Sequence, residues 1–245
     1  MTRSAGERHP RGGTPVGRRV LLGMGALGAV GVVVGSTVQR VVGDVLRPVA
    51  NTGGGGLGAL IPGADRFRIY TIVDFNPEPA RGGYRLAVDG LVDRPLSLSL
   101  ADLAAMPRTN LVKDFQCVTG WRVPSVHWSG VSLAHIIDAA GASPRARAVL
   151  FDSFDGAYTE SLTMEQARRP DVIVADRMLG VPVTQEHGGP VRLYVAPMYG
   201  YKSIKWLGRI RLSDQVVPGY WEQQGYDVDG WVGRSNGRSD APIDA

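Results

Sequence analysis

Residues 187–207 read HGGPVRLYVAPMYGYKSIKWL, and this stretch decides how the surrounding chain folds. Its apolar run, Val191–Val195, has the composition of a buried strand, and glycines precede and follow it. Three cations, Arg192, Lys202 and Lys205, border that strand and the turn after it. Cationic side chains and turn amides that converge in this way bind anions. A solvated basic loop is the alternative that these residues alone leave open.

The second informative stretch, FQCVTGWR over residues 115–122, holds the one cysteine of the chain. A single cysteine excludes an internal disulfide, a CxxC redox pair, a multi-cysteine zinc site and a c-type haem attachment. Cys117 precedes a Thr-Gly turn, and Arg122 five residues later favours a thiolate that suits a transition metal. Two other interpretations stay open: a buried thiol that packs as a small apolar side chain, and a nucleophile with a histidine base. The histidines available as that base are His127, His135 and His187.

Composition indicates a globular body preceded by a charged segment. The chain has 245 residues, of which 44% are hydrophobic, so it is long enough for a sizeable core. The formal net charge is +4, but five arginines and a single acid lie within the first nineteen residues. The rest of the chain is therefore close to neutral, which argues against a nucleic-acid partner.

Arg18 and Arg19 precede a mildly apolar run, Val20–Val38, which is the pattern of a twin-arginine export signal. The run approaches the ~20 residues that cross a bilayer. No clear A-x-A cleavage site follows it, so we expect an uncleaved anchor and a periplasmic or extracytoplasmic domain. The expected division is residues 1–40 as signal or anchor, 41–65 as Gly-rich tether, 66–235 as the folded domain and 236–245 as a polar tail.

The body contains many short strand patterns and three short helices. The strand-like runs are Phe67–Val73, Tyr84–Val88, Ala148–Phe151, Asp171–Val174, Val191–Val195 and Ile210–Leu212. The helix signals are Ser99 with Asp102, Thr163 with Gln166, and Ser132 before a helix Leu133–Ala140 that Gly141 ends. No long helical period and no internal repeat occurs, so the sequence predicts a mixed α+β domain rich in β structure.

Four motifs occur in the order FQCVTGW, WSGVSL, HGGPVRLYV and YGYKSIKWLGRI. In this order and spacing they resemble the molybdopterin domain of the sulfite oxidase family, over roughly Arg66 to Trp231. That family includes eukaryotic sulfite oxidases, plant nitrate reductases and bacterial periplasmic methionine-sulfoxide reductase catalytic subunits. The resemblance implies a sulfite-oxidase-type molybdopterin-binding fold over residues 66–235 and a Mo-molybdopterin cofactor.

The resemblance also implies roles for individual residues. Cys117 falls on the cysteine that coordinates molybdenum beside the pterin dithiolene. Arg122 and Tyr158 match residues of the substrate pocket, and together with Cys117 they are the expected catalytic residues. The expected cofactor-binding residues match family positions or belong to the cationic turn; they are Asn76, Asp152, His187, Arg192, Lys202, Ser203, Ile204 and Lys205.

Together these features describe an exported molybdenum-pterin oxidoreductase that transfers an oxygen atom to or from a small sulfur-containing substrate. Arg122 favours a sulfite-type oxyanion; the alternatives are a sulfoxide reductase of the same fold and a non-catalytic, membrane-tethered binding module. We expect no room for the immunoglobulin-like dimerisation domain of sulfite oxidases, and no haem domain. Because one cysteine cannot hold an iron–sulfur cluster, a separate cytochrome of b or c type is the expected electron-transfer partner.

Overall fold

The computed structural model describes residues 67–75, 77–79 and 83–238. The expected export segment, the Gly-rich tether and Asn76 lie outside these residues. Over the described ranges, no helix is both long enough and apolar enough to span a membrane.

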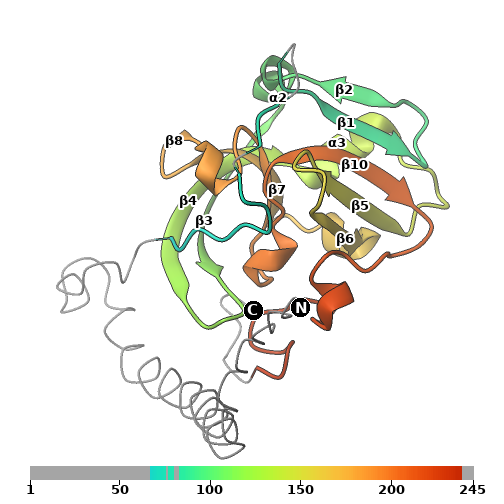
Figure 1. Cartoon of the computed structure of the whole chain (residues 1–245). Coiled ribbons are helices and arrows are strands. Elements are labelled where there is room, and N and C mark those ends of the chain that lie inside the picture. Colours follow the sequence, from blue (N-terminus) through green and yellow to red (C-terminus); the bar gives the residue numbers. More distant parts are fainter. Residues whose placement is uncertain (1–66, 76, 80–82, 239–245) are drawn as a thin grey trace, which may run out of the picture. The chain divides into compact units, whose positions relative to one another are not determined.

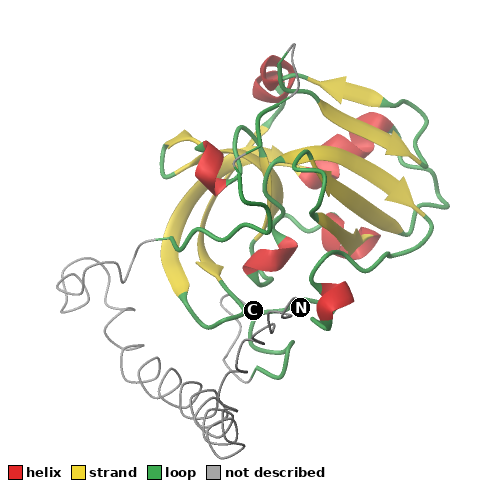
Figure 2. Ribbon diagram, viewed as in Figure 1, coloured by secondary structure: helices red, strands yellow, loops and turns green. Residues whose placement is uncertain are grey.

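Two five-stranded sheets form the body of the domain (Figures 1 and 2). The strands of the first sheet are β1 (Leu86–Gly90), β2 (Leu96–Leu98), β5 (Ala148–Ser153), β6 (Thr159–Thr163) and β10 (Leu207–Ser213). Their order is β2-β1-β10-β5-β6, and β1 runs parallel to β10 while the other pairs are antiparallel. The strands of the second sheet are β3 (Arg108–Gln116), β4 (Arg122–Ser132), β7 (Val172–Met178), β8 (Val181–Pro182) and β9 (Arg192–Val195). Their order is β3-β4-β7-β8, and β9 pairs with β7.

Three short α-helices connect these strands, and their ends follow the signals in the sequence. They are α2 (Leu100–Ala105), α3 (Leu133–Ala140) and α4 (Met164–Ala167). The expected capping boxes at Ser99 and Thr163 both form, and Gly141 ends α3 in the left-handed conformation, with a φ of 70°. Ser132 does precede α3, but its side chain makes no capping hydrogen bond.

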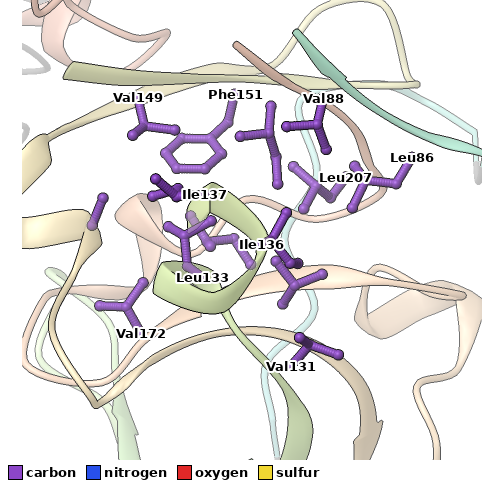
Figure 3. Packing of buried hydrophobic residues seen from close by; sticks show 14 of the residues in the cluster. Leu86, Val88, Val131, Leu133, Ile136, Ile137, Val149, Phe151, Val172 and Leu207 are labelled. Carbon is purple, nitrogen blue, oxygen red and sulfur yellow. The ribbon is translucent and has the colours of Figure 1, made fainter. Parts of the chain in front are cut away.

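The main core lies between the two sheets, and α3 occupies its centre (Figure 3). Ile136 and Ile137 of α3 are fully buried, with Phe151 of the first sheet on one side and Val131 of the second on the other. The helix can be apolar on so much of its surface because a sheet covers it from each side. This arrangement confirms the predicted β-rich α+β fold.

Some strand predictions need correction. The run Phe67–Val73 is not a strand: it crosses the domain without regular structure, and residues 67–72 line a cavity instead of alternating across a sheet. The hairpin of β3 and β4 was not predicted from the sequence, because polar residues interrupt its alternation. A register shift between Lys113 and Phe115 marks the interruption, and Asp114 there accepts a hydrogen bond from the Ser125 amide.

The packing of α3 predicts which substitutions unfold the domain. Ile136→Ala should lower the free energy of unfolding by about 2–5 kcal/mol, because the cavity that it leaves is closed in by both sheets. Asp138→Ala on the same helix removes an exposed ion pair with Arg168 and should cost less than about 1 kcal/mol. Urea denaturation of both variants measures the difference; equal effects would contradict the central place of α3 in the core.

Candidate active site

A cavity of about 560 Å³ brings together residues that are far apart in the sequence. Its lining includes Cys117, the irregular segment 67–72, and the turns that flank β9. Seven of the predicted site residues line it: Cys117, Tyr158, His187, Arg192, Ser203, Ile204 and Lys205. The two stretches singled out in the sequence therefore meet at one site.

The thiol is presented by the tight turn between β3 and β4. Cys117 donates its amide to the Trp121 carbonyl at 2.9 Å, and Gly120 donates its amide to the Cys117 carbonyl at 3.0 Å. Gly120 has a φ of 106°, which other residues rarely adopt, so the glycine is required by this turn. The Thr119 hydroxyl donates to Cys117 Sγ at 3.2 Å. This donor stabilises negative charge on the sulfur, as a metal-binding thiolate requires.

Arg192, at the start of β9, ties together the two turns on the cationic side of the cavity. Its Nη1 donates to the His187 carbonyl at 2.7 Å and its Nη2 to the Ser203 carbonyl at 2.8 Å. The rings of Phe115 and Trp128 lie 5.4 and 5.5 Å from the guanidinium. Only 3% of Arg192 is exposed, and this burial lowers its pKa to about 10. A positive charge is thus built into the wall of the cavity.

His187 and Lys205 stand beside that charge. The pKa of His187 is lowered, first by burial and then by the charge of Arg192, so its ring is neutral at pH 7. Burial, together with Arg192, lowers the pKa of Lys205 to about 8. The Lys205 ammonium lies 4.3 Å from the centre of the Trp206 ring and donates to the Glu186 carbonyl at 3.0 Å.

Close packing of backbone explains the glycines of the HGGP turn. A Cβ on Gly188 would lie 2.6 Å from Lys205 Cβ, and one on Gly189 would lie 2.1 Å from the Val183 carbonyl. Ser203 uses its hydroxyl to accept the Val195 amide, and Ile204 accepts the Leu193 amide with its carbonyl. This part of the wall is therefore a rigid backbone surface that carries the side chain of Lys205.

Three of the other predicted site residues do not line the cavity. Arg122 lies 3.5 Å from the Asp114 carboxylate, and Asp152 pairs with Arg211 at 3.1 Å. Lys202 is buried in a cluster with two glutamates, and Asn76 lies outside the described residues. The sequence could not separate Lys202 from Lys205, because their difference depends on residues distant in the chain.

Five further aromatic residues line the cavity, and together we call them the aromatic wall. They are Tyr158, Tyr201, Tyr220, Trp221 and Tyr226. Neighbouring rings along the wall, from Tyr158 through Tyr220, Trp221 and Tyr226 to Tyr201, have centroids 5.3–5.8 Å apart. The sequence analysis found only Tyr158; the density of aromatic residues at 220–226 is the signal that it did not use.

These residues fit an anionic pterin with one soft metal ligand. The cavity has a thiol in its wall and two cations on one side, and the Trp121 indole N–H in its lining is buried without a hydrogen-bond partner. Among the described residues, no group of three or more His, Cys, Asp or Glu residues is placed to hold a metal ion by itself. A metal at Cys117 would therefore need ligands from a cofactor.

The lowered pKa of Lys205 predicts how anion binding depends on pH. Lys205 loses its charge as the pH rises through about 8, while His187 is already neutral and Arg192, with a pKa of about 10, remains charged. The affinity of the apoprotein for sulfate, whose own charge is constant here, should fall about tenfold per pH unit above pH 8. Calorimetric titration measures it. Lys205→Met should bind weakly and equally from pH 7 to 9; the same pH dependence in that variant would contradict the assignment.

Comparison with known proteins gives a consistent result. The family model described as "Oxidoreductase molybdopterin binding domain" matches residues 74–221. The chain is 36% identical over 147 residues to the uncharacterized oxidoreductase YuiH of Bacillus subtilis (strain 168), covering 60% of this chain and 74% of YuiH. It is 29% identical over 185 residues to the protein-methionine-sulfoxide reductase catalytic subunit MsrP of Gluconobacter oxydans (strain 621H), covering 69% and 58%.

A solved structure shares the fold. The sulfane dehydrogenase SoxCD of Paracoccus pantotrophus is similar with a TM-score of 0.54 and 23% identity, over 69% of this chain and 47% of that one. The chain thus spans less than two thirds of MsrP and about half of the SoxCD chain. The family model, in contrast, covers more than half of this chain and includes Cys117, His187 and Lys205. The chain therefore belongs to the family of oxidoreductases with a molybdopterin binding domain, and it is a molybdopterin-dependent oxidoreductase of the sulfite-oxidase type.

Proposed function

We propose that this enzyme reduces neutral organic sulfoxides by oxygen-atom transfer. The observation that carries the proposal is the lining of the cavity that holds Cys117, which includes the five rings of the aromatic wall. Arg122, the cation expected to orient an oxyanion, lies against Asp114 outside the lining. The MsrP relative is a protein-methionine-sulfoxide reductase, which supports the same substrate class.

The protein holds the cofactor and the substrate on different sides of the cavity. Cys117 supplies the thiolate ligand, with Thr119 as a donor to its sulfur. Arg192 and Lys205 supply the positive charge that an anionic pterin needs. When bound, a molybdenum-pterin group provides the two-electron couple that side chains lack. In the overall reaction the sulfoxide takes up two electrons and two protons, its S–O bond breaks, and a sulfide and water are released.

The aromatic wall contacts the organic part of the substrate. Tyr158 donates its hydroxyl hydrogen to the Tyr201 carbonyl at 2.7 Å, so this hydrogen is not available to a ligand. Burial raises the pKa of Tyr158 well above its usual value, and the phenol stays neutral at all working pH values. The rings of the aromatic wall therefore offer the substrate an uncharged surface, which favours an apolar or polarised neutral molecule over a free oxyanion.

Oxidation of a sulfite-type oxyanion is the second candidate. It is favoured by the cations that line the other part of the cavity, since Arg68 is exposed there and Lys205 lies beside Arg192. An oxyanion on that side would compete with the pterin for the same charges, which is why we rank this reaction second.

The remaining steps of turnover involve other molecules. The chain has one cysteine, which cannot both bind molybdenum and hold an iron–sulfur cluster, so electrons come from a separate protein, for which we propose a cytochrome of b or c type. The MsrP relative is named a catalytic subunit, in keeping with such a partner. The N-terminal segment, residues 1–40, is proposed to export the folded enzyme and to anchor it at the membrane.

The first test combines a substitution with a substrate panel. With a reduced dye as electron donor, the purified holoenzyme should reduce organic sulfoxides and should oxidise sulfite poorly with a dye acceptor. Cys117→Ser should lower turnover to background, because a hard alkoxide donor replaces a soft thiolate. Thr119→Val keeps the thiolate and should cost only about 10- to 100-fold. Faster turnover of sulfite than of every sulfoxide would favour the second candidate.

The second test concerns export. Replacing Arg18 and Arg19 with Lys should leave folded, cofactor-loaded protein in the cytoplasm, because the twin-arginine pathway recognises the arginine pair. Cell fractionation followed by immunoblotting measures the distribution. Normal export of the double variant would argue for secretion of an unfolded chain, and a cofactor loaded in the cytoplasm would then be excluded.

A further inference from the structure

Lys202 lies where four segments of the chain meet behind the aromatic wall. Its ammonium donates to Glu160 Oε1 at 2.5 Å, to Glu222 Oε1 at 2.7 Å and to the Val228 carbonyl at 2.9 Å. A lysine ammonium has three N–H donors, so all three are used inside the protein. Lys202 is 0% exposed and does not line the cavity. It therefore has no donor left for a cofactor.

Each of the four segments also supplies at least one ring of the aromatic wall. In each segment, the aromatic residue of the wall and the residue that belongs to the Lys202 cluster are at most two positions apart in the sequence. These pairs are Tyr158 and Glu160, Tyr201 and Lys202, Trp221 and Glu222, and Tyr226 and Val228. Only β6, which carries Glu160, is a strand; the other three segments are 3₁₀ turns or loops, without strand partners to hold them.

We infer that Lys202 is a positioning residue, whose ammonium holds the four segments of the aromatic wall in register so that their rings form one continuous substrate surface. The proposed function supplies the identity of the substrate, and the inference rests on it for that alone. Lys205, three residues later, faces the cavity and belongs to the cofactor side. The two nearby lysines therefore have different roles: Lys205 binds the cofactor, and Lys202 orders the aromatic wall.

The charge of the cluster supports a positioning role. Glu160 and Glu222 have side chains 1% exposed, and the Oε2 atom of each has no hydrogen-bond partner. Burial raises the pKa of Glu160 well above its usual value, although Lys202 opposes the rise, and Glu222 adds to it. Protonation of Glu160 lowers the amount of negative charge that is buried here, and burial favours this change. Buried ionic clusters contribute little net stability, but their hydrogen bonds demand a defined geometry.

The test compares a neutral version of the cluster with a variant on the cofactor side. The triple variant Glu160→Gln, Lys202→Met and Glu222→Gln removes every charge together and avoids the unpaired buried carboxylates that Lys202→Met alone would leave. Lys205→Met is the matched control. Both are prepared as loaded protein and are examined for pterin and molybdenum content, for hydrogen exchange of the segments 155–160 and 219–228, and for steady-state sulfoxide reduction.

In the triple variant, exchange of both segments should rise at least tenfold, KM for a sulfoxide should rise at least tenfold, and kcat should change less than threefold. Pterin content should equal that of the wild type. Lys205→Met should show the reverse pattern: lower pterin content and unchanged exchange in the two segments. Loss of pterin from the triple variant to the level of Lys205→Met would overturn the inference, as would unchanged exchange of the wall.

A milder substitution covers the case in which the triple variant does not fold. Glu160→Gln keeps an acceptor for the Lys202 ammonium and replaces the carboxyl whose pKa is raised by burial. The urea midpoint, the exchange of the wall and KM should then match the wild type at pH 7; a large loss of stability would show that Glu160 is ionised and would contradict a neutral carboxyl at this position. If the wild type reduces no sulfoxide at all, the proposed function fails, while exchange and pterin content still decide the role of Lys202.

Discussion

The site depends most on the two hydrogen bonds that the buried guanidinium of Arg192 donates to the carbonyls of His187 and Ser203. These bonds join the turn before β9 to the turn after it, at the end of the 3₁₀ segment Gly200–Lys202, and so set the spacing of the two cofactor-binding turns. Phe115, beside the Cys117 turn, packs against the same guanidinium. One side chain thus connects the thiol-bearing hairpin with both cofactor-binding turns.

Local sequence was sufficient to predict those parts of the site that residues close together in the chain form. His187, Arg192 and Lys205 lie within nineteen residues of one another, and one strand with its two turns brings them together. The same holds for Cys117, whose turn requires only Gly120 and the flanking hairpin. The family resemblance added what residues alone could not provide, namely that the cysteine meets those cations and that the cofactor is a molybdenum-pterin group.

Long-range packing decided the surroundings of several residues, which the local sequence could not predict. Lys202 and Lys205 cannot be distinguished by residue type. Glu160, 42 residues away in the sequence, accepts a hydrogen bond from Lys202 within a buried ionic cluster. Arg122 follows the motif cysteine at the expected distance, yet the register shift in β3 sets Asp114 beside it. Tyr220 reaches the cavity only because the chain after β10 returns to β6, where the Tyr220 amide bonds to the Thr159 carbonyl. None of these contacts can be predicted from the sequence around the residues that make them.

Arg192 also explains why the cationic side is suited to a bound anion rather than to water. Among the described residues no carboxylate pairs with it; its hydrogen bonds go to carbonyls, and burial lowers its pKa to about 10 without any opposite charge to restore it. The folded chain therefore bears the cost of burying this charge before any ligand arrives. An anionic pterin beside Arg192 would supply the missing countercharge in a site of low polarity, where electrostatic attraction is strong. The burial of Arg192, which costs free energy, thus makes cofactor binding favourable, because the geometry is already formed.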